Sequence, residues 1–303
     1  MGILVVGSVA LDSVKTPFGR KDEVLGGSAT YFGVAASYFA DVSVVGVVGD
    51  DFPKEHVDFL RRKGIDSSGL QREKGKTFRW KGEYSADLAE RTTLDTQLNV
   101  FAEFSPKLLP LHCSQDYVFL GNIDPDLQRL VLEQVEHPKL VACDTMNYWI
   151  EGKRPSLLKT LSKIDLLIIN DEEARQLAAE QNLFRAARII HEMGPETLVI
   201  KRGEYGAVLF NSGSIFSIPA FPVEEVVDPT GAGDSFAGGL VGYLAASGER
   251  DDAALRKAVA FGSVMASFNV MNFGPQQLGD LTYTEIEARY REFHRILFFE
   301  DIA

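Results

Sequence analysis

The chain has 303 residues, 45% of them hydrophobic and 24% charged, which is the composition of an ordinary globular protein with a buried core. Its formal net charge of −12 speaks against a surface that binds nucleic acid or an anionic membrane, because phosphate groups attract Lys and Arg. The sequence shows no basic leader and no run of 18 apolar residues, so we expect a cytoplasmic protein without a signal peptide or a membrane span.

Short apolar, β-branched runs alternate with segments of helical periodicity along most of the chain. We expect strands at residues 3–7, 42–49, 117–122, 140–144, 165–170, 197–201 and 207–211. We expect helices at 53–63, 124–135, 171–180 and 183–193, followed by a mainly helical C-terminal part at 233–246, 250–268 and 283–299. Continuous apolar strands that alternate with helices predict one α/β domain with a mainly parallel sheet covered on both faces.

Two segments depart from this alternation. Residues 76–104 contain short strand-like pieces with aromatic residues at Phe78, Trp80 and Tyr84, and residues 13–24 have a similar character. We expect them to form a small β-sheet that projects from the main sheet as a lid, and a surface hairpin is the alternative. A homodimer through this lid is the oligomeric arrangement that the pattern leaves open.

The stretch VVDPTGAGDSFAGG, residues 226–239, joins a glycine-rich turn to the start of an apolar helix. It is neither a G-x-G-x-x-G fingerprint nor a Walker phosphate loop. The backbone N–H groups of Gly231, Ala232 and Gly233 would form an anion-binding site at the first turn of that helix. Asp234 in the same turn suits a general base that accepts the proton of a substrate hydroxyl. The alternative is an N-cap aspartate on a core helix.

The run DPTGAGDSFAGG resembles the C-terminal signature of the ribokinase-like, or PfkB-type, carbohydrate kinases. Other motifs of that family occur in the same order: GSVALD (7–12), GGSATYFGVAAS (26–37), GVVGDDFPKEHVDFLRRKGID (46–66), NDEE (170–173) and KRGEYGAVLF (201–210). The resemblance implies a ribokinase-like three-layer α/β/α core with a mainly parallel sheet and a small β-sheet lid. We therefore expect one kinase domain over residues 1–303, with a discontinuous lid from about 13–24 and 76–104.

The reaction that the resemblance implies is transfer of the γ-phosphoryl group of ATP to a hydroxyl of a small-molecule substrate. Asp234 matches the family's catalytic base, and the amides of residues 231–233 match its anion hole. Asn170 and Glu173 match the pair that orders Mg²⁺ through its water ligands. An ordinary helix N-cap with an acidic first turn is the alternative for that pair.

On the substrate side, the resemblance assigns sugar hydroxyls to Asp12 and to the Gly26 and Gly27 pair. A carboxylate accepts two hydroxyl hydrogen bonds, and glycines let a ligand approach the backbone. Tyr31 occupies a position where the family often has Asn. This difference removes a hydroxyl partner and predicts an aromatic wall in its place.

On the nucleotide side, Lys201, Gly203 and Gly206 match the turn over the phosphates and ribose. Asp228 and Thr230 match donors of a monovalent-cation site in many relatives. ATP and Mg²⁺ are therefore the expected cofactors, with K⁺ as a further candidate.

The acceptor that we expect is a neutral sugar, polyol or glycoside, because the substrate motifs hold few basic residues for a phosphorylated compound. A nucleoside kinase is the alternative, since aromatic faces pack on a nucleobase as readily as on a sugar ring. A non-catalytic sugar-binding protein on the same fold is a third possibility, and the intact GAGD run speaks against it.

Overall fold

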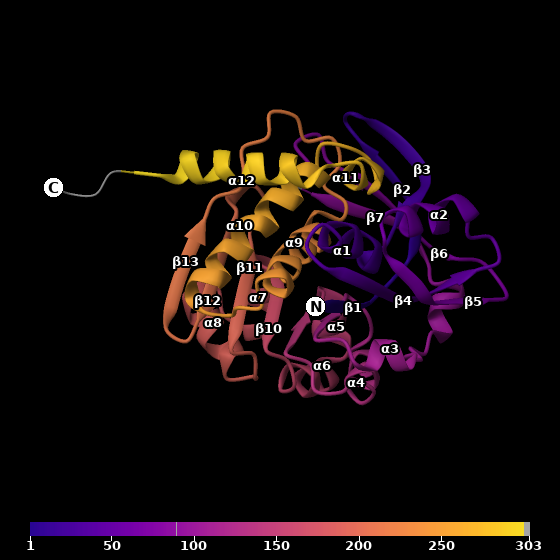
Figure 1. Cartoon of the computed structure of the whole chain (residues 1–303), viewed down its shortest axis with the longest axis horizontal. Helices are drawn as coiled ribbons and strands as arrows, with labels where there is room; N and C mark the ends of the chain where they lie inside the picture. The colour runs from indigo at the N-terminus through magenta and orange to yellow at the C-terminus, as the bar shows by residue number, and fades with distance from the viewer. Residues whose placement is uncertain (89, 300–303) are drawn as a thin grey trace.

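A computed structural model describes residues 1–88 and 90–299 of the chain, and a nine-stranded sheet forms its centre (Figure 1). Its strands are β1 (Gly2–Val6), β4 (Asp41–Gly49), β5 (Asp66–Glu73), β8 (Tyr117–Leu120), β9 (Leu140–Cys143), β10 (Leu166–Asn170), β11 (Thr197–Lys201), β12 (Ala207–Asn211) and β13 (Ser214–Ile218). They lie in the order β13-β12-β11-β10-β9-β8-β1-β4-β5. Neighbours from β11 to β5 pair in parallel, and β12 and β13 pair antiparallel.

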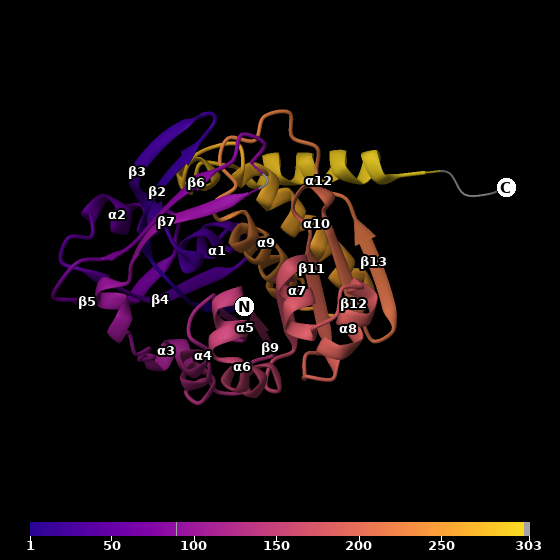
Figure 2. The same cartoon turned by 180° about the vertical axis from the view of Figure 1, so that it is seen from behind.

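Helices cover both faces of this sheet (Figures 1 and 2). One face packs on α1 (Ser28–Ala36), α2 (Lys54–Arg62), α9 (Ala232–Ser247), α10 (Asp252–Asn269), α11 (Gln276–Gly279) and α12 (Tyr283–Leu297). The other packs on α4 (Pro125–Leu132), α5 (Asn147–Gly152), α6 (Arg154–Leu161), α7 (Asp171–Ala178) and α8 (Leu183–His191), while α3 (Pro110–Cys113) precedes β8. Successive side chains of β1 enter opposite cores, with Ile3 in one and Leu4 in the other, so the three-layer α/β/α prediction is confirmed.

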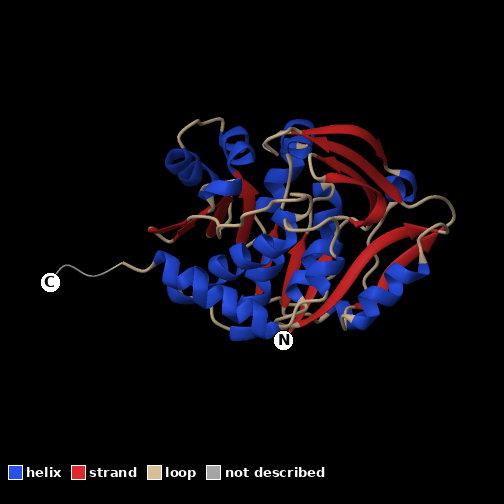
Figure 3. Ribbon diagram, turned by 90° about the horizontal axis from the view of Figure 1, so that it is seen from above, coloured by secondary structure: helices blue, strands red, loops and turns tan. Residues whose placement is uncertain are grey.

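A second sheet of four strands lies at one end of the large sheet (Figure 3). Its strands are β2 (Ala10–Thr16), β3 (Gly19–Gly26), β6 (Phe78–Tyr84) and β7 (Arg91–Gln97), in the order β3-β2-β6-β7. The predicted small sheet is therefore confirmed, but it takes in more of the N-terminal segment than expected and ends earlier in the second. Residues Asn99–Glu103 form a 3-10 helix, η1, instead of a strand.

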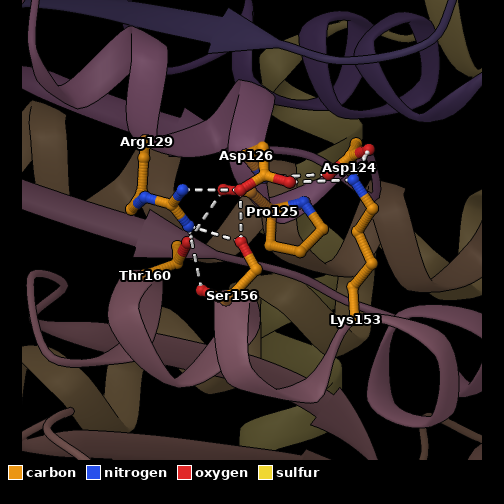
Figure 4. A network of polar contacts seen from close by, with 7 residues as sticks. All are labelled: Asp124, Pro125, Asp126, Arg129, Lys153, Ser156 and Thr160. Atoms are coloured by element: carbon orange, nitrogen blue, oxygen red, sulfur yellow. Dashed lines mark hydrogen bonds and ion pairs between the residues drawn. The ribbon is translucent and has the colours of Figure 1, made fainter.

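On one helical face, α4 and α6 are joined by a network of charged and polar side chains (Figure 4). Lys153 donates to Asp124 at 2.7 Å and to Asp126 at 2.8 Å, and Arg129 and Ser156 also bond Asp126. The Lys153 ammonium and the Ser156 hydroxyl lower the pKa of Asp126. This network connects α4 to α6 within one helical layer, and none of its residues is among those predicted for the site. Among the described residues, none of the helices combines the length and apolar character that crossing a membrane requires.

Candidate active site

Three neighbouring parallel strands bring polar side chains to one edge of the large sheet. Asp144 directly follows β9, Asn170 ends β10, and Lys201 ends β11. Asn170 and Lys201 are register partners, and the Lys201 Nζ reaches across the end of β10 to within 3.3 Å of Asp144 Oδ2. Ligands of α/β sheets bind at this carboxyl edge, so the topology itself marks the region as a site.

Lys201 keeps its charge although the ion pair is buried. The exposed fractions of the two side chains are 16% for Lys201 and 9% for Asp144. Burial alone would lower the pKa of the Lys201 ammonium, but the carboxylates of Asp144 and Glu173 outweigh it and raise that pKa. The site therefore contains a fixed positive charge.

Asn170 and Glu173 form a reciprocal capping box at the start of α7. The Asn170 Oδ1 accepts from the Glu173 N–H, and the Glu173 Oε2 accepts from the Asn170 N–H, each at 2.8 Å. The helix-start alternative for this pair is therefore present in the structure. Burial, and next the Asp144 carboxylate, nevertheless raise the pKa of Glu173 to about 7, which a capping role alone does not require.

The glycine-rich turn before α9 is shaped by two close approaches. Gly231 has φ 76°, and a Cβ atom there would lie 2.3 Å from the Tyr31 ring, so only glycine fits. A Cβ atom at Gly233 would lie 3.0 Å from the Lys201 Nζ. The ammonium group thus lies beside Gly233, and it adds a positive charge next to the turn where the anion site is predicted.

Asp234 lies in the first turn of α9, next to that lysine. Burial raises the pKa of Asp234 to about 7, the Asp144 carboxylate adds to the shift, and Lys201 and Arg91 oppose it. A carboxyl group with a pKa near the working pH is suited to accept and release a proton. The raised pKa is compatible with a general base, and that role of Asp234 stays a prediction.

Asp12 lies across the site on β2, against the glycine pair that precedes α1. The Gly27 N–H donates to its carboxylate, and a Cβ atom at Gly26 would lie 1.9 Å from the Asp12 Oδ2. Burial raises the pKa of Asp12 to about 7, and the charges of Asp228 and Asp234 contribute to the shift. Asp12, which is predicted to bind the substrate, therefore lies close enough to Asp234 for the two charges to interact.

Tyr31 is buried beside the glycine-rich turn, and its predicted role as an aromatic wall for the acceptor stays a prediction. The side chain is 1% exposed, and its ring packs on the backbone of Gly231. Its hydroxyl oxygen is buried without a hydrogen-bond partner among the described residues. The carboxylates of Asp12 and Asp228 lie near enough to raise the pKa of Tyr31 further after burial has done so. The Tyr31 ring therefore packs against the backbone of the turn at Gly231.

The inner face of the small sheet contributes residues that the sequence matches did not assign. Asp12 on β2 is the register partner of Trp80 on β6, so the two side chains leave the small sheet on the same face. The Trp80 indole lies over Gly82 on its own strand, where a Cβ atom would be 2.1 Å from it, and it donates to the Thr93 Oγ1 of β7 at 3.2 Å. Tyr84 on β6 pairs with Arg91 on β7, and the Tyr84 hydroxyl lies 3.2 Å from the Thr230 Oγ1. The Arg91 guanidinium lies 5.6 Å from the Trp80 ring centroid.

Arg91 extends the electrostatics of the site into the small sheet. Its positive charge lowers the pKa of both Asp234 and Glu173 after larger effects of burial. Strand alternation within residues 76–104 is the signal that could have identified it, because Arg91 shares a face with Tyr84. Phe78, in contrast, stacks on Phe101 of η1.

The remaining predicted residues lie in two turns. Gly203 and Gly206 have φ values of 55° and 85° in the turn between β11 and β12, immediately after Lys201. Asp228 and Thr230 precede the Gly231 turn, where the Asp228 Oδ1 accepts from the Thr230 N–H at 2.9 Å. All of the predicted residues are thus gathered around one edge of the sheet.

The glycines inside α9 have a packing explanation. A Cβ atom at Gly238 would lie 2.4 Å from the Phe32 carbonyl oxygen of α1, and one at Gly239 would lie 2.7 Å from Met265 of α10. Gly242 similarly approaches Phe39. These glycines therefore let α9 pack closely against α1 and α10.

Comparison with known proteins gives consistent results. The family described as pfkB family carbohydrate kinase matches residues 11–280. A curated cytidine kinase from Thermococcus kodakarensis is 32% identical over 250 residues, which cover 80% of this chain and 88% of the relative. Two crystal structures share the fold. A nucleoside kinase from Methanocaldococcus jannaschii, described as an archaeal member of the ribokinase family, has a TM-score of 0.77 at 20% identity, covering 96% of this chain and 98% of the other. Aminoimidazole riboside kinase from Salmonella enterica, complexed with aminoimidazole riboside and an ATP analog, has a TM-score of 0.74 at 18% identity, covering 96% and 100%.

Proposed function

The chain belongs to the pfkB family of carbohydrate kinases, and on this basis we propose that it phosphorylates a hydroxyl group of a nucleoside. Family membership makes the protein an ATP-dependent phosphotransferase that acts on an alcohol group. The observation that carries the nucleoside proposal is the pairing of Asp12 with Trp80 on neighbouring strands. A carboxylate suits the hydroxyls of a ribose, and an indole on the same face of the small sheet suits the face of a base.

In the proposed reaction, Asp234 accepts the proton of the attacking hydroxyl. The amides of residues 231–233 and the Lys201 ammonium stabilise the negative charge on the oxygens of the transferring phosphoryl group. Asp234 and Lys201 both adjoin the same glycine turn, so attack and charge stabilisation occur at one place. Gly203 and Gly206 then form the turn under the nucleotide phosphates and ribose.

The residues present also fit Mg²⁺. Glu173 is a buried carboxyl group whose pKa is raised to about 7, so an arriving cation would favour its charged form. Asn170 and Glu173 would hold the ion through its waters, since Mg²⁺ usually keeps several of them. When bound with ATP, the metal would neutralise charge on the phosphate oxygens.

Glu173→Gln separates this role from helix capping. Glutamine can still accept from the Asn170 N–H, but it lacks the charge that attracts a hydrated cation. We expect the Mg²⁺ concentration for half-maximal rate to rise about 10-fold, with the KM for the acceptor little changed. The exposed neighbour in the same turn gives the matched control, Glu172→Gln, which should leave the Mg²⁺ dependence unchanged. A Glu173→Gln variant that loses only thermal stability would limit Glu173 to capping.

The two sheets support a single kinase domain over residues 1–303, and residue 89 and residues 300–303 of that range lie outside the described part. We propose that the small sheet, predicted at about 13–24 and 76–104, acts as a lid over the acceptor. The hydrogen bond between Tyr84 and Thr230 supports this role, because it joins the small sheet to the turn at residues 230–234. We call this segment the phosphate-binding turn. Strand β7 is exposed along its whole length, and we propose a homodimer through this edge. A cytoplasmic location is likewise a proposal.

A screen of acceptors by coupled release of ADP tests the substrate class. It includes cytidine, other ribonucleosides, ribose, hexoses, inositols and a sugar phosphate. The similarity to a cytidine kinase supports a nucleoside as the acceptor, whereas the sequence alone favoured a neutral sugar. Neutral sugars remain the second candidate, because Asp12 accepts hydroxyls of either class. Activity on a sugar phosphate alone would contradict both.

Trp80→Ala gives the residue-level test of the nucleoside. Stacking of a base on an aromatic side chain contributes about 1–3 kcal/mol, so we expect at least about a 5-fold higher nucleoside KM in this variant. Trp80→Phe keeps an aromatic face and should stay near the wild-type KM. If Trp80→Ala leaves the KM of the preferred nucleoside unchanged, the indole does not contact the base.

A further inference from the structure

The side chain of Asn269, the last residue of α10, connects both ends of the phosphate-binding turn. Its Nδ2 donates to the Thr230 carbonyl at 2.8 Å, just before Gly231. Its Oδ1 accepts from the Ser235 hydroxyl at 3.1 Å, just after Asp234. Asn269 is 2% exposed and Ser235 is fully buried, so water does not compete for these hydrogen bonds. The bonds therefore fix the position of the turn relative to α10.

The same hydrogen bonds occupy the oxygens of the expected monovalent-cation site. The Thr230 carbonyl accepts from Asn269, and the Thr230 Oγ1 lies 3.2 Å from the Tyr84 hydroxyl. The Asp228 Oδ1 accepts from the Thr230 N–H. An alkali cation binds where several oxygens face it together. Here a hydrogen-bond partner from the protein faces each of these three oxygens, so the residues present do not fit K⁺.

One oxygen of this group, Oδ2 of Asp228, is buried without a hydrogen-bond partner in the described part of the chain. A single oxygen does not make a cation site.

We propose that the Asn269 side-chain amide replaces a monovalent cation as the group that positions the phosphate-binding turn, so that phosphoryl transfer needs no K⁺. Asn269 is then a positioning residue, since it acts on the amides of residues 231–233 and on Asp234 through Thr230 and Ser235. The inference rests on the kinase activity of the family and holds whichever hydroxyl compound is the acceptor.

The first test compares the rates of the full-length wild-type enzyme in KCl and in choline chloride at equal ionic strength. We expect the two rates to agree within about twofold, because the Asn269 amide positions the turn without a bound cation. Thermal unfolding of the protein without ligands should likewise have the same midpoint in both salts. A saturable activation by K⁺ of about 10-fold or more would overturn the proposal.

The second test uses Asn269→Asp, which keeps the shape of the side chain but replaces the donor to Thr230 with a second carboxylate near Asp228. We expect its rate in choline chloride to fall at least about 10-fold, because displacement of an anion-hole donor has effects of this size or larger. KCl should restore part of that rate and raise the unfolding midpoint. Asn272→Asp adds the same charge three residues further along and should show neither effect. A fully active Asn269→Asp variant would overturn the proposal.

If Asn269→Asp does not fold, Asn269→Ser removes the reach of the side chain without adding charge. We expect it to lower kcat about 10-fold with the acceptor KM within about twofold, because the turn acts on the transferring group rather than on acceptor binding. An unchanged kcat would show that Asn269 does not position the turn.

Discussion

We expect Asp234→Asn to lower kcat by at least about 100-fold while the affinity for ATP changes little. Asparagine has the same shape but cannot take the proton of the attacking hydroxyl. The buried Asp234 carboxyl has a pKa raised to about 7, so its charged form is destabilised where it lies. The wild type loses stability through this group as the pH rises from the ordinary pKa of 3.8 to about 7, so the uncharged variant should equal the wild type in acid and be more stable at pH 7 and above.

Steady-state kinetics and thermal unfolding of the purified variant check both halves of this expectation. A rate loss together with retained stability assigns Asp234 to the chemistry. Asp251→Asn gives a matched control, because Asp251 caps the start of the neighbouring helix α10 and asparagine is an equally good cap. Turnover of Asp234→Asn close to the wild-type value would remove Asp234 from the role of base.

Lys201→Met should be the second most damaging change, because it affects both stability and catalysis. It leaves the buried Asp144 carboxylate without its partner 3.3 Å away, and breaking a buried ion pair in this way costs about 3–5 kcal/mol of unfolding free energy. It also removes the positive charge beside Gly233, so we expect kcat to fall at least about 100-fold.

A double variant separates these two effects. Adding Asp144→Asn to Lys201→Met removes the stranded charge and should recover much of the lost stability, but not the rate. Lys153→Met breaks two ion pairs in the network of Figure 4 and should leave kcat unchanged, which controls for the loss of a paired lysine. If the double variant regained the wild-type rate, Lys201 would be structural only.

The sequence could predict the strands of the sheet interior, because both of their faces are buried and their apolar runs are continuous. Strands β5 and β13 escaped prediction because they are the two edges of the large sheet. β5 reads DSSGLQRE and has one buried residue, and β13 alternates half-buried and exposed residues over most of its length. Edge strands of this kind lack the apolar pattern that identifies a strand.

The candidate site was predictable where its residues are adjacent in sequence to a motif, as at Asp234. Asn269 was not, because it contacts Thr230 from the end of another helix, and a local pattern contains no information about such a contact. For Arg91, strand alternation indicates the face that it shares with Tyr84 but not the effect of its charge on Asp234. Tyr31 was predicted at the site, but the burial of its ring behind Gly231 depends on how α1 packs against α9.

Phosphorus NMR of a reaction with ATP, Mg²⁺ and the nucleoside that releases ADP fastest tests the central claim most directly. The proposed function predicts a new phosphate monoester on the nucleoside, formed in the same amount as ADP. With Asp234→Asn, the ester should accumulate at least about 100-fold more slowly. Release of ADP and inorganic phosphate without an ester on any nucleoside or neutral sugar would contradict the claim that this site transfers a phosphoryl group to a hydroxyl acceptor.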